Sequence, residues 1–505
     1  MPRKRPALAL LAAIFAAALA PLPARAQGND RSAPTGGRSA LMGNTGVALG
    51  RDGAAPFLNP ATIVGIGDQK VAFSVNFFTF DYQHFNHWHQ PSGVDTSRFG
   101  NVALDGSGET TTHFTALPST LCLFFTVAGV GDDDNDKTRG WQRGKQKLAV
   151  CLGSLESQQV GLPALSYRGA TGAGSTAQVQ SLNRNWNRLT VGPTYSVALT
   201  DALSIGASLH GVVTADSFSL NSASITSVPG GGALQSSLGA GGNGHAVDIT
   251  AILGAAYRVG STTVGLSAQL PALHVFGTYQ GTLENQYTAA NANTATVTNS
   301  SGDFRAPPPV RLAAGVGWEA TKTFTLEVDG SYDLPQTEAL ATTVSVSSTT
   351  ATTAGVTPSS TTSATYVLPS RGTWNAAIGT EYFLSPTFSL IGGISTNLTS
   401  LRPLTPSMTV GNLAQARTDW INLSFGIGSY GAAGDLLIGT QLGYGWGEAI
   451  AINPYIVPNN WAVIDIQNYS ALIVLAGSTN LRTLGRAMKA VEHVVTEGKP
   501  ADAPK

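Results

Sequence analysis

The stretch RLTVGPTYSVALT, residues 188–200, alternates apolar and polar side chains. Successive side chains of a strand point to opposite faces of the sheet, so Leu189, Val191 and Tyr195 share one face. Thr190 and Thr194 share the other. The same period of two recurs elsewhere, at 245–259, 322–333 and 436–447. These stretches predict strands with one apolar and one polar face.

Such stretches recur along the chain and predict about fourteen strands, an even number that is usual for outer-membrane barrels. They lie at 71–82, 113–130, 147–155, 188–199, 203–214, 245–259, 262–270, 310–319, 322–333, 373–384, 387–397, 418–429, 434–447 and 461–475. Long connections, such as 156–187, alternate with short ones, such as 260–261. Outer-membrane barrels have long loops at one end and short turns at the other. The predicted fold is all-β, a transmembrane antiparallel β-barrel.

Composition narrows the function classes. Only 12% of the 505 residues are charged and the net charge is −1, which does not favour nucleic-acid binding. The long segments 227–244 and 341–365 are rich in Gly or in Ser and Thr, and we expect them to be mobile surface segments. A strand extension of the hairpin stays open for VSVSSTT, residues 344–350, where alternation continues briefly.

The first residues, MPRKRPALALLAAIFAAALAPLPARAQ, have the features of an export signal. A positive start precedes a short apolar run and the small-residue site Ala24-Arg25-Ala26. Residues 1–26 are therefore predicted to be a signal peptide. No later run is long and apolar enough for a spanning helix, so we expect a barrel in the outer membrane of a Gram-negative bacterium, with both termini periplasmic.

The segment GRDGAAPFLNPATIVG, residues 50–65, is irregular. Proline cannot donate to a β-ladder, and it disrupts a helix interior. Pro56 and Pro60 therefore argue against both a central strand and a long helix.

The longer stretch GRSALMGNTGVALGRDGAAPFLNPATIVG, residues 37–65, resembles the N-terminal segment of the FadL family of outer-membrane transporters of long-chain fatty acids and aromatic hydrocarbons. The resemblance is carried by a Gly- and Ala-rich start, an acidic residue and the motif Asn59-Pro60-Ala61. The stretches 307–333 and 371–395 resemble later parts of that family more loosely. The resemblance implies a hatch at 27–66 inside a barrel at 67–477.

The resemblance further implies passive uptake of a hydrophobic ligand, movement of the hatch on binding, and lateral release into outer-membrane lipid. Asn59, Pro60 and Ala61 are the predicted hatch residues, and Glu327 and Asp329 are weaker candidates for lining the lumen. We expect a monomer. Two alternatives stay open: a structural or surface barrel that does not transport, and a general porin for polar solutes, which would have an open lumen without a plug.

The chain departs from the family at its C-terminus. Residues 478–505 are predicted to form a periplasmic tail, partly helical, because apolar residues recur on one helical face at 479–499. A solvated or loosely docked tail is favoured over a helix that binds a partner.

Other motifs predict little chemistry. Cys122 and Cys151 flank a hairpin whose tip is the acidic and basic run 131–147, so we hypothesise a disulfide between them. His84, His87 and His89 lie close together, but without further ligands they favour a polar loop over a metal site. The acidic run lacks the spacing of a calcium loop. No G-x-S-x-G elbow or phosphate-binding loop is present, so we expect no enzyme activity and no cofactor or metal.

Overall fold

The computed structural model describes residues 33–67, 70–85, 107–113, 118–128, 141–171, 174–228, 232–289, 292–335, 341–367, 370–404, 416–431, 434–453 and 460–480. Four features predicted above lie wholly or mainly outside these residues. They are the signal peptide at 1–26, His87 and His89, the run at 131–140, and residues 481–499 of the C-terminal helix.

Among the described residues, three short helices precede the strands: α2 (Arg38–Leu41), α3 (Ala55–Leu58) and the 3-10 helix η1 (Pro60–Gly65). Within the described part of the chain, no helix is long and apolar enough to cross a membrane. The strands are β1 (Lys70–Phe85), β2 (Ser107–His113), β3 (Pro118–Ala128), β4 (Gln146–Thr171), β5 (Gly174–Ala198), β6 (Leu203–Val228), β7 (Gly232–Val259), β8 (Thr262–Gln269), β9 (Leu273–Ala289), β10 (Ala292–Arg305), β11 (Arg311–Trp318), β12 (Phe324–Asp333), β13 (Ala341–Thr352), β14 (Gly355–Val367), β15 (Thr373–Ser385), β16 (Phe388–Asn397), β17 (Arg417–Tyr430), β18 (Gly434–Asn453) and β19 (Asn460–Asn480).

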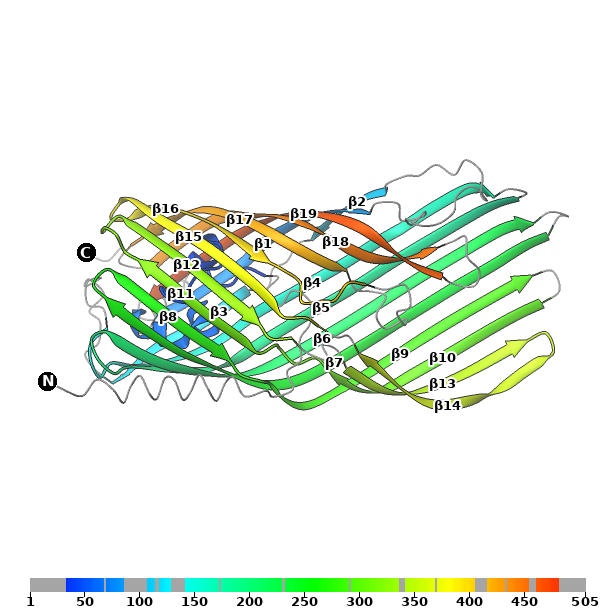
Figure 1. Cartoon of the computed structure of the whole chain (residues 1–505), viewed down its shortest axis with the longest axis horizontal. Helices are drawn as coiled ribbons and strands as arrows, with labels where there is room; N and C mark the ends of the chain where they lie inside the picture. The colour runs from blue at the N-terminus through cyan, green and yellow to red at the C-terminus, as the bar shows by residue number, and fades with distance from the viewer. Residues whose placement is uncertain are drawn as a thin grey trace, which may run out of the picture.

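The described strands form one closed antiparallel barrel (Figure 1). It closes because β1 pairs with β19 on one side and with β2 and β3 on the other. The nineteen segments make fourteen barrel strands, since β2–β3, β8–β9, β10–β11, β12–β13 and β14–β15 are each one interrupted strand. The prediction of about fourteen strands is confirmed, and each predicted range overlaps one of them.

The alternation faces the opposite way from that of a soluble β-protein, with apolar side chains outward and polar side chains inward. Leu189, Val191 and Tyr195 point out of the barrel and are 41–44% exposed, whereas Thr190 and Thr194 point inward and are at most 2% exposed. A soluble β-protein buries its apolar face in a core. An apolar outer face over a polar interior is the arrangement that a lipid-embedded barrel requires.

The two ends of the barrel differ. Short connections such as 199–202 and 260–261 lie at one end, which we call the short-turn end, and hairpins such as β4–β5 and β6–β7 project at the other, the long-hairpin end (Figure 1). The expectation of mobile surface segments at 227–244 and 341–365 was wrong for most of these residues. They form β6, β7, β13 and β14. Pairing with neighbouring strands satisfies the backbone N–H and C=O groups of these residues, so they form strands without an apolar core.

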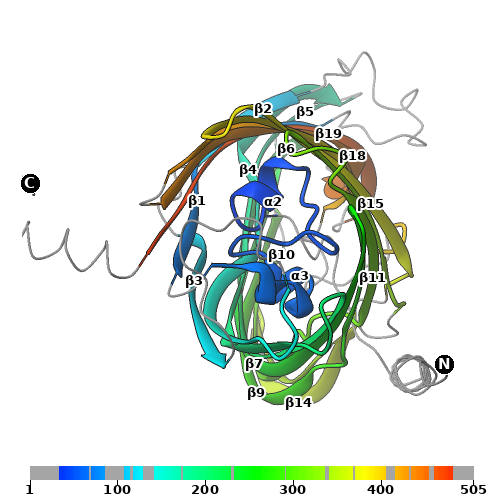
Figure 2. The ribbon, with the colours of Figure 1, turned by 90° about the vertical axis from the view of Figure 1, so that its left-hand side faces the viewer.

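Residues 33–67, which we call the N-terminal segment, lie inside the barrel in its short-turn half. Figure 2 shows α2 and α3 surrounded by the ring of strands. Contacts join α2 to β16, β17, β18 and β19, and η1 to β4, β5, β6 and β7, so the segment touches much of the circumference. Its apolar residues are buried, among them Leu41, Phe57 and Ile63. The segment therefore lies across the lumen at this level.

Candidate functional site: the N-terminal segment and its barrel wall

Asn59, Pro60 and Ala61 form the junction between α3 and η1. Asn59 is extended and fully buried, and its Oδ1 accepts a hydrogen bond from the backbone N–H of Ala61 (3.1 Å), which caps η1. Its Nδ2 donates to the carbonyl of Val47 (2.7 Å) and to that of Ala255 on β7 (3.1 Å). Pro60 begins η1, where its missing N–H is not needed. The Asn59 side chain thus stabilises the fold of the segment and also bonds the segment to the barrel wall.

Asp52 braces the segment from within. Its carboxylate accepts the backbone N–H groups of Gly37 (2.9 Å), Ser39 (2.8 Å) and Ala54 (3.1 Å), and also the Ser39 hydroxyl (2.9 Å). Residues at the start of the segment are thereby held to the loop before α3. Asp52 is the acidic residue that carries part of the family resemblance, but nothing in the sequence indicated this bracing role.

Glu327 and Asp329 on β12 point into the lumen and hold the segment by its backbone. Asp329 Oδ2 accepts the N–H groups of Gly46 (2.8 Å) and Val47 (3.0 Å). Glu327 Oε1 accepts those of Ala48 and Leu49, both at 2.8 Å. Two wall carboxylates therefore satisfy four consecutive backbone donors that have no strand partner. Such charge-assisted hydrogen bonds are stronger than neutral ones.

A buried ion pair anchors the segment to the neighbouring strand, since β15 pairs with β12. Arg38 Nε lies 2.7 Å from Glu381 Oε2 on β15, and both side chains are at least nine-tenths buried. Ser389 and Tyr430 donate their hydroxyls to the other oxygen of Glu381, while Arg38 donates to the Leu49 carbonyl (3.3 Å). Breaking a buried pair leaves an uncompensated charge. The sequence pattern did not reveal this pair, because 343 residues separate its members.

Glycines in the wall make room for the segment. A Cβ at Gly254 would lie 2.1 Å from Asn59 Oδ1, and a Cβ at Gly206 would lie 2.6 Å from the Pro60 backbone. Eight further wall glycines would each place a Cβ within 3.0 Å of the segment: Gly153, Gly265, Gly315, Gly317, Gly379, Gly393, Gly426 and Gly439. The small inner surface of these strands is therefore shaped to the N-terminal segment.

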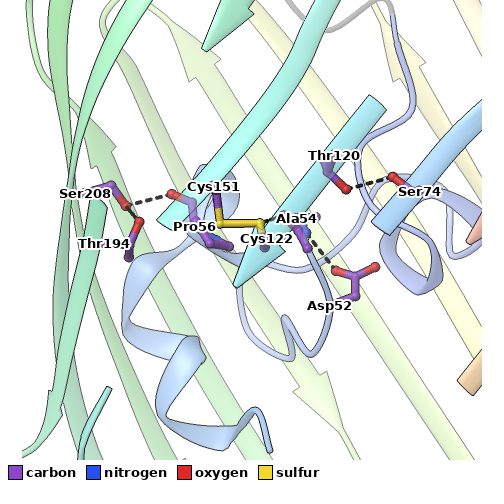
Figure 3. Close-up of a disulfide and its surroundings, with 10 residues drawn as sticks. Asp52, Ala54, Pro56, Ser74, Thr120, Cys122, Cys151, Thr194 and Ser208 are labelled. Atoms are coloured by element: carbon purple, nitrogen blue, oxygen red, sulfur yellow. Dashed lines mark hydrogen bonds between the residues drawn. A yellow bond between two sulfur atoms is a disulfide. The ribbon is translucent and has the colours of Figure 1, made fainter. Parts of the chain in front are cut away.

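Wall hydroxyls complete the docking (Figure 3). Ser208 on β6 donates to the Pro56 carbonyl (2.8 Å) and contacts the Thr194 hydroxyl (2.8 Å). Ser196 and Ser204 both donate to the Ala61 carbonyl, at 3.2 and 2.9 Å. The carbonyls of α3 and η1 are thus bonded to the barrel as well as to the segment itself.

Cys122 and Cys151 are joined by a disulfide (Figure 3). They face each other directly in the register of β3 and β4, and both are buried on the inner face. With Ala55, Phe57 and Ile63 they form one apolar cluster between wall and segment. The bridge therefore fixes the two strands against which α3 packs.

We expect removal of this bridge to destabilise the barrel. A cross-link that closes a loop of about 30 residues is worth roughly 3.5 kcal/mol in the chain-entropy model. A Cys122→Ala/Cys151→Ala variant should unfold at lower denaturant concentration than the parent, as measured by tryptophan fluorescence.

The disulfide itself can be detected by peptide mapping. Digestion of the alkylated parent should release a linked peptide pair that reductant separates. Peptide maps that are identical with and without reductant would contradict the bond.

A charged layer lies inside the barrel beyond the segment. Arg188 pairs with Glu156 (2.6 Å), Arg311 pairs with Asp333 (2.6 Å), and all four side chains are buried. A small apolar cluster, which includes Trp186, Phe304 and Leu401, covers this layer. In the described part of the chain, no group of three His, Cys, Asp or Glu residues is arranged to hold a metal ion.

A cavity of about 20 Å³ lies between this layer and the segment. Its walls combine apolar side chains with two guanidinium groups, and they comprise Leu155, Arg188, Thr190, His210, Val212, Thr250, Ile252, Gln269, Pro308, Pro309 and Arg311. The His210 ring also stacks near Phe57 of the segment, with ring centroids 5.0 Å apart. A volume of this size holds about one water molecule. A larger ligand can enter only if the surrounding groups move.

The barrel wall next to this cavity is interrupted. The β9–β10 ladder ends at the pair Tyr279 and Gly302. Residues 273–278 of β9 pair only with β7, and residues 303–305 of β10 pair only with β13, within the described strands. The following segment, 306–310, contains three prolines that cannot donate to a ladder. Two of them, Pro308 and Pro309, line the cavity.

A partly exposed ion pair at the short-turn end predicts that docking of the N-terminal segment depends on pH. Glu319, in the turn between β11 and β12, pairs with Arg51 of the segment and with Arg258. Partial burial of Glu319 raises its pKa, but the two arginines outweigh burial and hold the pKa below its usual range. A group with a lowered folded-state pKa stabilises the docked state above its free pKa and loses that contribution as pH falls through the lowered value.

Hydrogen exchange at residues 50–52 should therefore accelerate when pH falls below about 4.5, the usual range of a glutamate. The rates must first be corrected for intrinsic exchange. A Glu319→Gln variant should show fast exchange already at neutral pH and little further change on acidification. Equal acid sensitivity in parent and variant would refute this role of Glu319.

No protein-family model and no curated protein matches the sequence. Solved structures do match its fold. The structure of a Pseudomonas aeruginosa FadL homologue aligns with a TM-score of 0.51 and 13% identity, and covers 89% of this chain and 99% of that chain. The Pseudomonas putida toluene transporter TodX aligns with a TM-score of 0.51 and 15% identity, and covers 90% and 100%. The chain has the fold of the FadL family.

The resemblance predicted from residues 37–65 is thus confirmed at the level of the fold. In this FadL-like barrel, Asn59, Pro60, Ala61, Glu327 and Asp329 all lie at the boundary between the N-terminal segment and the wall. Arg38, Glu381 and the wall glycines belong to the same boundary, and were found only in three dimensions.

Proposed function

We propose that the FadL-like barrel is an outer-membrane channel that takes up hydrophobic molecules by passive diffusion, and that the N-terminal segment is its hatch. The observation that carries the proposal is the docking of residues 33–67 inside the lumen by carboxylates, hydroxyls and glycines of the wall. Long-chain fatty acids and aromatic hydrocarbons are the proposed substrates. The toluene-transporter description of the similar TodX barrel supports the second class.

The small cavity is the proposed resting place of the ligand. Its lining residue His210 packs against Phe57 of the hatch, and its walls combine apolar side chains with polar groups, among them two guanidinium groups. Because it holds about one water as it stands, occupancy by a hydrocarbon must displace the hatch or the 306–310 segment. Ligand binding is then coupled to this displacement, because the ligand binds only the arrangement in which the cavity is large enough to hold it.

Lateral release is proposed to pass through the gap between β9 and β10. The gap adjoins the cavity through Pro308 and Pro309, and opens beside the exposed side chains Leu273, Val275 and Phe276. A ligand leaving here enters lipid rather than water. Each methylene kept out of water is worth about 0.8 kcal/mol.

The N-terminal segment inside the lumen weighs against the porin alternative, because a general porin needs an open water path.

A transport assay distinguishes the proposed channel from a structural barrel that does not transport. Deletion of residues 40–62 should change uptake of radiolabelled long-chain fatty acid or aromatic hydrocarbon by cells that depend on this protein, at equal amounts of folded protein in the membrane. Heat-modifiable migration of the folded barrel on gels gives that control. Unchanged uptake of every tested compound would refute transport.

A further inference from the structure

The outward face of the barrel changes character abruptly toward the long-hairpin end. One cross-strand row on β5, β6, β7 and β9 is wholly apolar and consists of Leu189, Val213, Val247 and Phe276. Four residues further along β5, the corresponding row is wholly polar. It comprises Asn185, Ser217, Asn243, Gln280 and, on β10, Ser301. The apolar surface thus ends along a common line across these strands.

A second polar row follows the first. It comprises Asn183, Ser219, Gly241, Thr282 and Asn299, again paired strand by strand. The side chains of both rows, other than the glycine, are exposed. Because Gly241 has no side chain, the surface is hollowed between its polar neighbours.

These rows line an open concavity of about 760 Å³. That volume falls within the range of small-molecule sites, about 300–1,000 Å³. Its lining, among the described residues, holds no charged side chain: Asn183, Asn185, Ser217, Phe218, Ser219, Gly241, Gly242, Asn243, Gln280, Gly281, Thr282, Asn299, Ser300 and Ser301. Amide and hydroxyl groups can both donate and accept hydrogen bonds.

The uncharged amide and hydroxyl lining of the concavity favours one class of ligand. An anion would call for arginine, lysine or a cluster of N–H groups, and a hydrocarbon would call for an apolar lining. A dense set of uncharged donors and acceptors matches a ligand with many neutral hydroxyls. We propose that the concavity binds the uncharged sugars of a lipid-linked saccharide of the surrounding outer leaflet.

The position of the concavity decides the source of the saccharide. It lies on the outer surface of the barrel, on the same strands as the apolar row and beyond it, with the row Asn187, Ala215, His245 and Thr278 between the two. A lipid whose chains cover Leu189 and Val213 therefore places its innermost headgroup against this intervening row, and its outer sugars reach Asn185 and Ser217. The inference rests on the proposed placement in the outer membrane, but not on transport or on the hatch.

The test uses the purified full chain in lipid nanodiscs, titrated with two lipopolysaccharides and followed by native mass spectrometry. One carries its neutral outer sugars, and the other is truncated to the lipid and its innermost charged sugars. We expect the complete form to bind about tenfold more tightly, since two net hydrogen bonds contribute about 1.4 kcal/mol or more. Equal affinity for the two forms would overturn the proposal.

Two variants locate the binding. Gly241→Trp fills the hollow, and a Cβ there meets nothing closer than 3.6 Å. Asn185→Ala/Asn243→Ala removes hydrogen-bonding groups without adding bulk. Both should abolish the preference for the complete form, whereas Gly330→Trp, at an exposed glycine on β12 with no neighbour within 4 Å of a Cβ, should preserve it. A preference that survives both variants would refute the site.

Free oligosaccharide released from the same lipopolysaccharide should bind more weakly than the lipid-linked form. Binding that is equally tight would contradict the lipid-linked source. The 40–62 deletion, which tests transport, should leave saccharide binding unchanged. Failure of the proposed function and failure of this inference are therefore distinguishable.

Discussion

Replacing Glu327 and Asp329 together by alanine is expected to release the N-terminal segment and open the lumen to water. The double variant leaves the N–H groups of Gly46, Val47, Ala48 and Leu49 without their acceptors. Each buried donor left unsatisfied costs about 1–3 kcal/mol. Since 1.4 kcal/mol changes an equilibrium about tenfold, a loss of even about 3 kcal/mol raises the undocked fraction about a hundredfold.

Planar-bilayer recording measures this opening directly. The parent should show little or no conductance, and the double variant should show frequent steps of a water-filled pore. Val328→Ala is the matched control, because Val328 lies between the two acids on β12 but points outward and is 45% exposed. A double variant that stays as silent as Val328→Ala would show that these carboxylates do not hold the segment.

Replacing Gly254 by leucine should prevent docking by a different route. A Cβ at this position would lie 2.1 Å from Asn59 Oδ1 and 2.8 Å from the Pro60 ring, so the Asn59-Pro60-Ala61 junction must move away from β7. Overpacking of a tight interior typically costs about 1–3 kcal/mol. Displacement would also break the Asn59 bond to the Ala255 carbonyl.

Limited proteolysis from the short-turn side reports this displacement. In the Gly254→Leu variant, Arg38 or Arg51 should become a trypsin site, while the barrel strands stay resistant. Gly330→Leu is the control of equal size, since no atom lies within 4 Å of a Cβ there. Equal protection of the N-terminal segment in both variants would contradict close docking at Gly254.

The strands of the short-turn half could be predicted because their signal is local. Alternation at 188–200 and 322–333 assigns each side chain to a face without reference to any other strand. It placed Glu327 and Asp329 opposite Val328, as the structure has them. The prolines at 56 and 60 likewise argued against a central strand and a long helix for the stretch that became the short helices α3 and η1.

The long hairpins escaped prediction for the opposite reason. Residues 341–352 are mostly Ser and Thr, and the alternation of Val344 and Val346 with serines is too brief to mark more than a short strand extension. Their order comes from pairing with neighbours, as β13 pairs with both β10 and β14. A polar strand is stabilised by its partners rather than by a buried face, and the partners are not visible in its own sequence.

By itself, the sequence determined the period of the strands, their number and the irregularity of residues 50–65, since each depends on residues close together in the chain. Only the tertiary structure decided what holds that segment. Arg38 meets Glu381, Gly46 meets Asp329 and Asn59 meets Gly254 across nearly 200 to more than 340 residues of chain. A carboxylate on a strand shows which face it occupies. Which backbone donors it satisfies is settled only when the barrel closes around them.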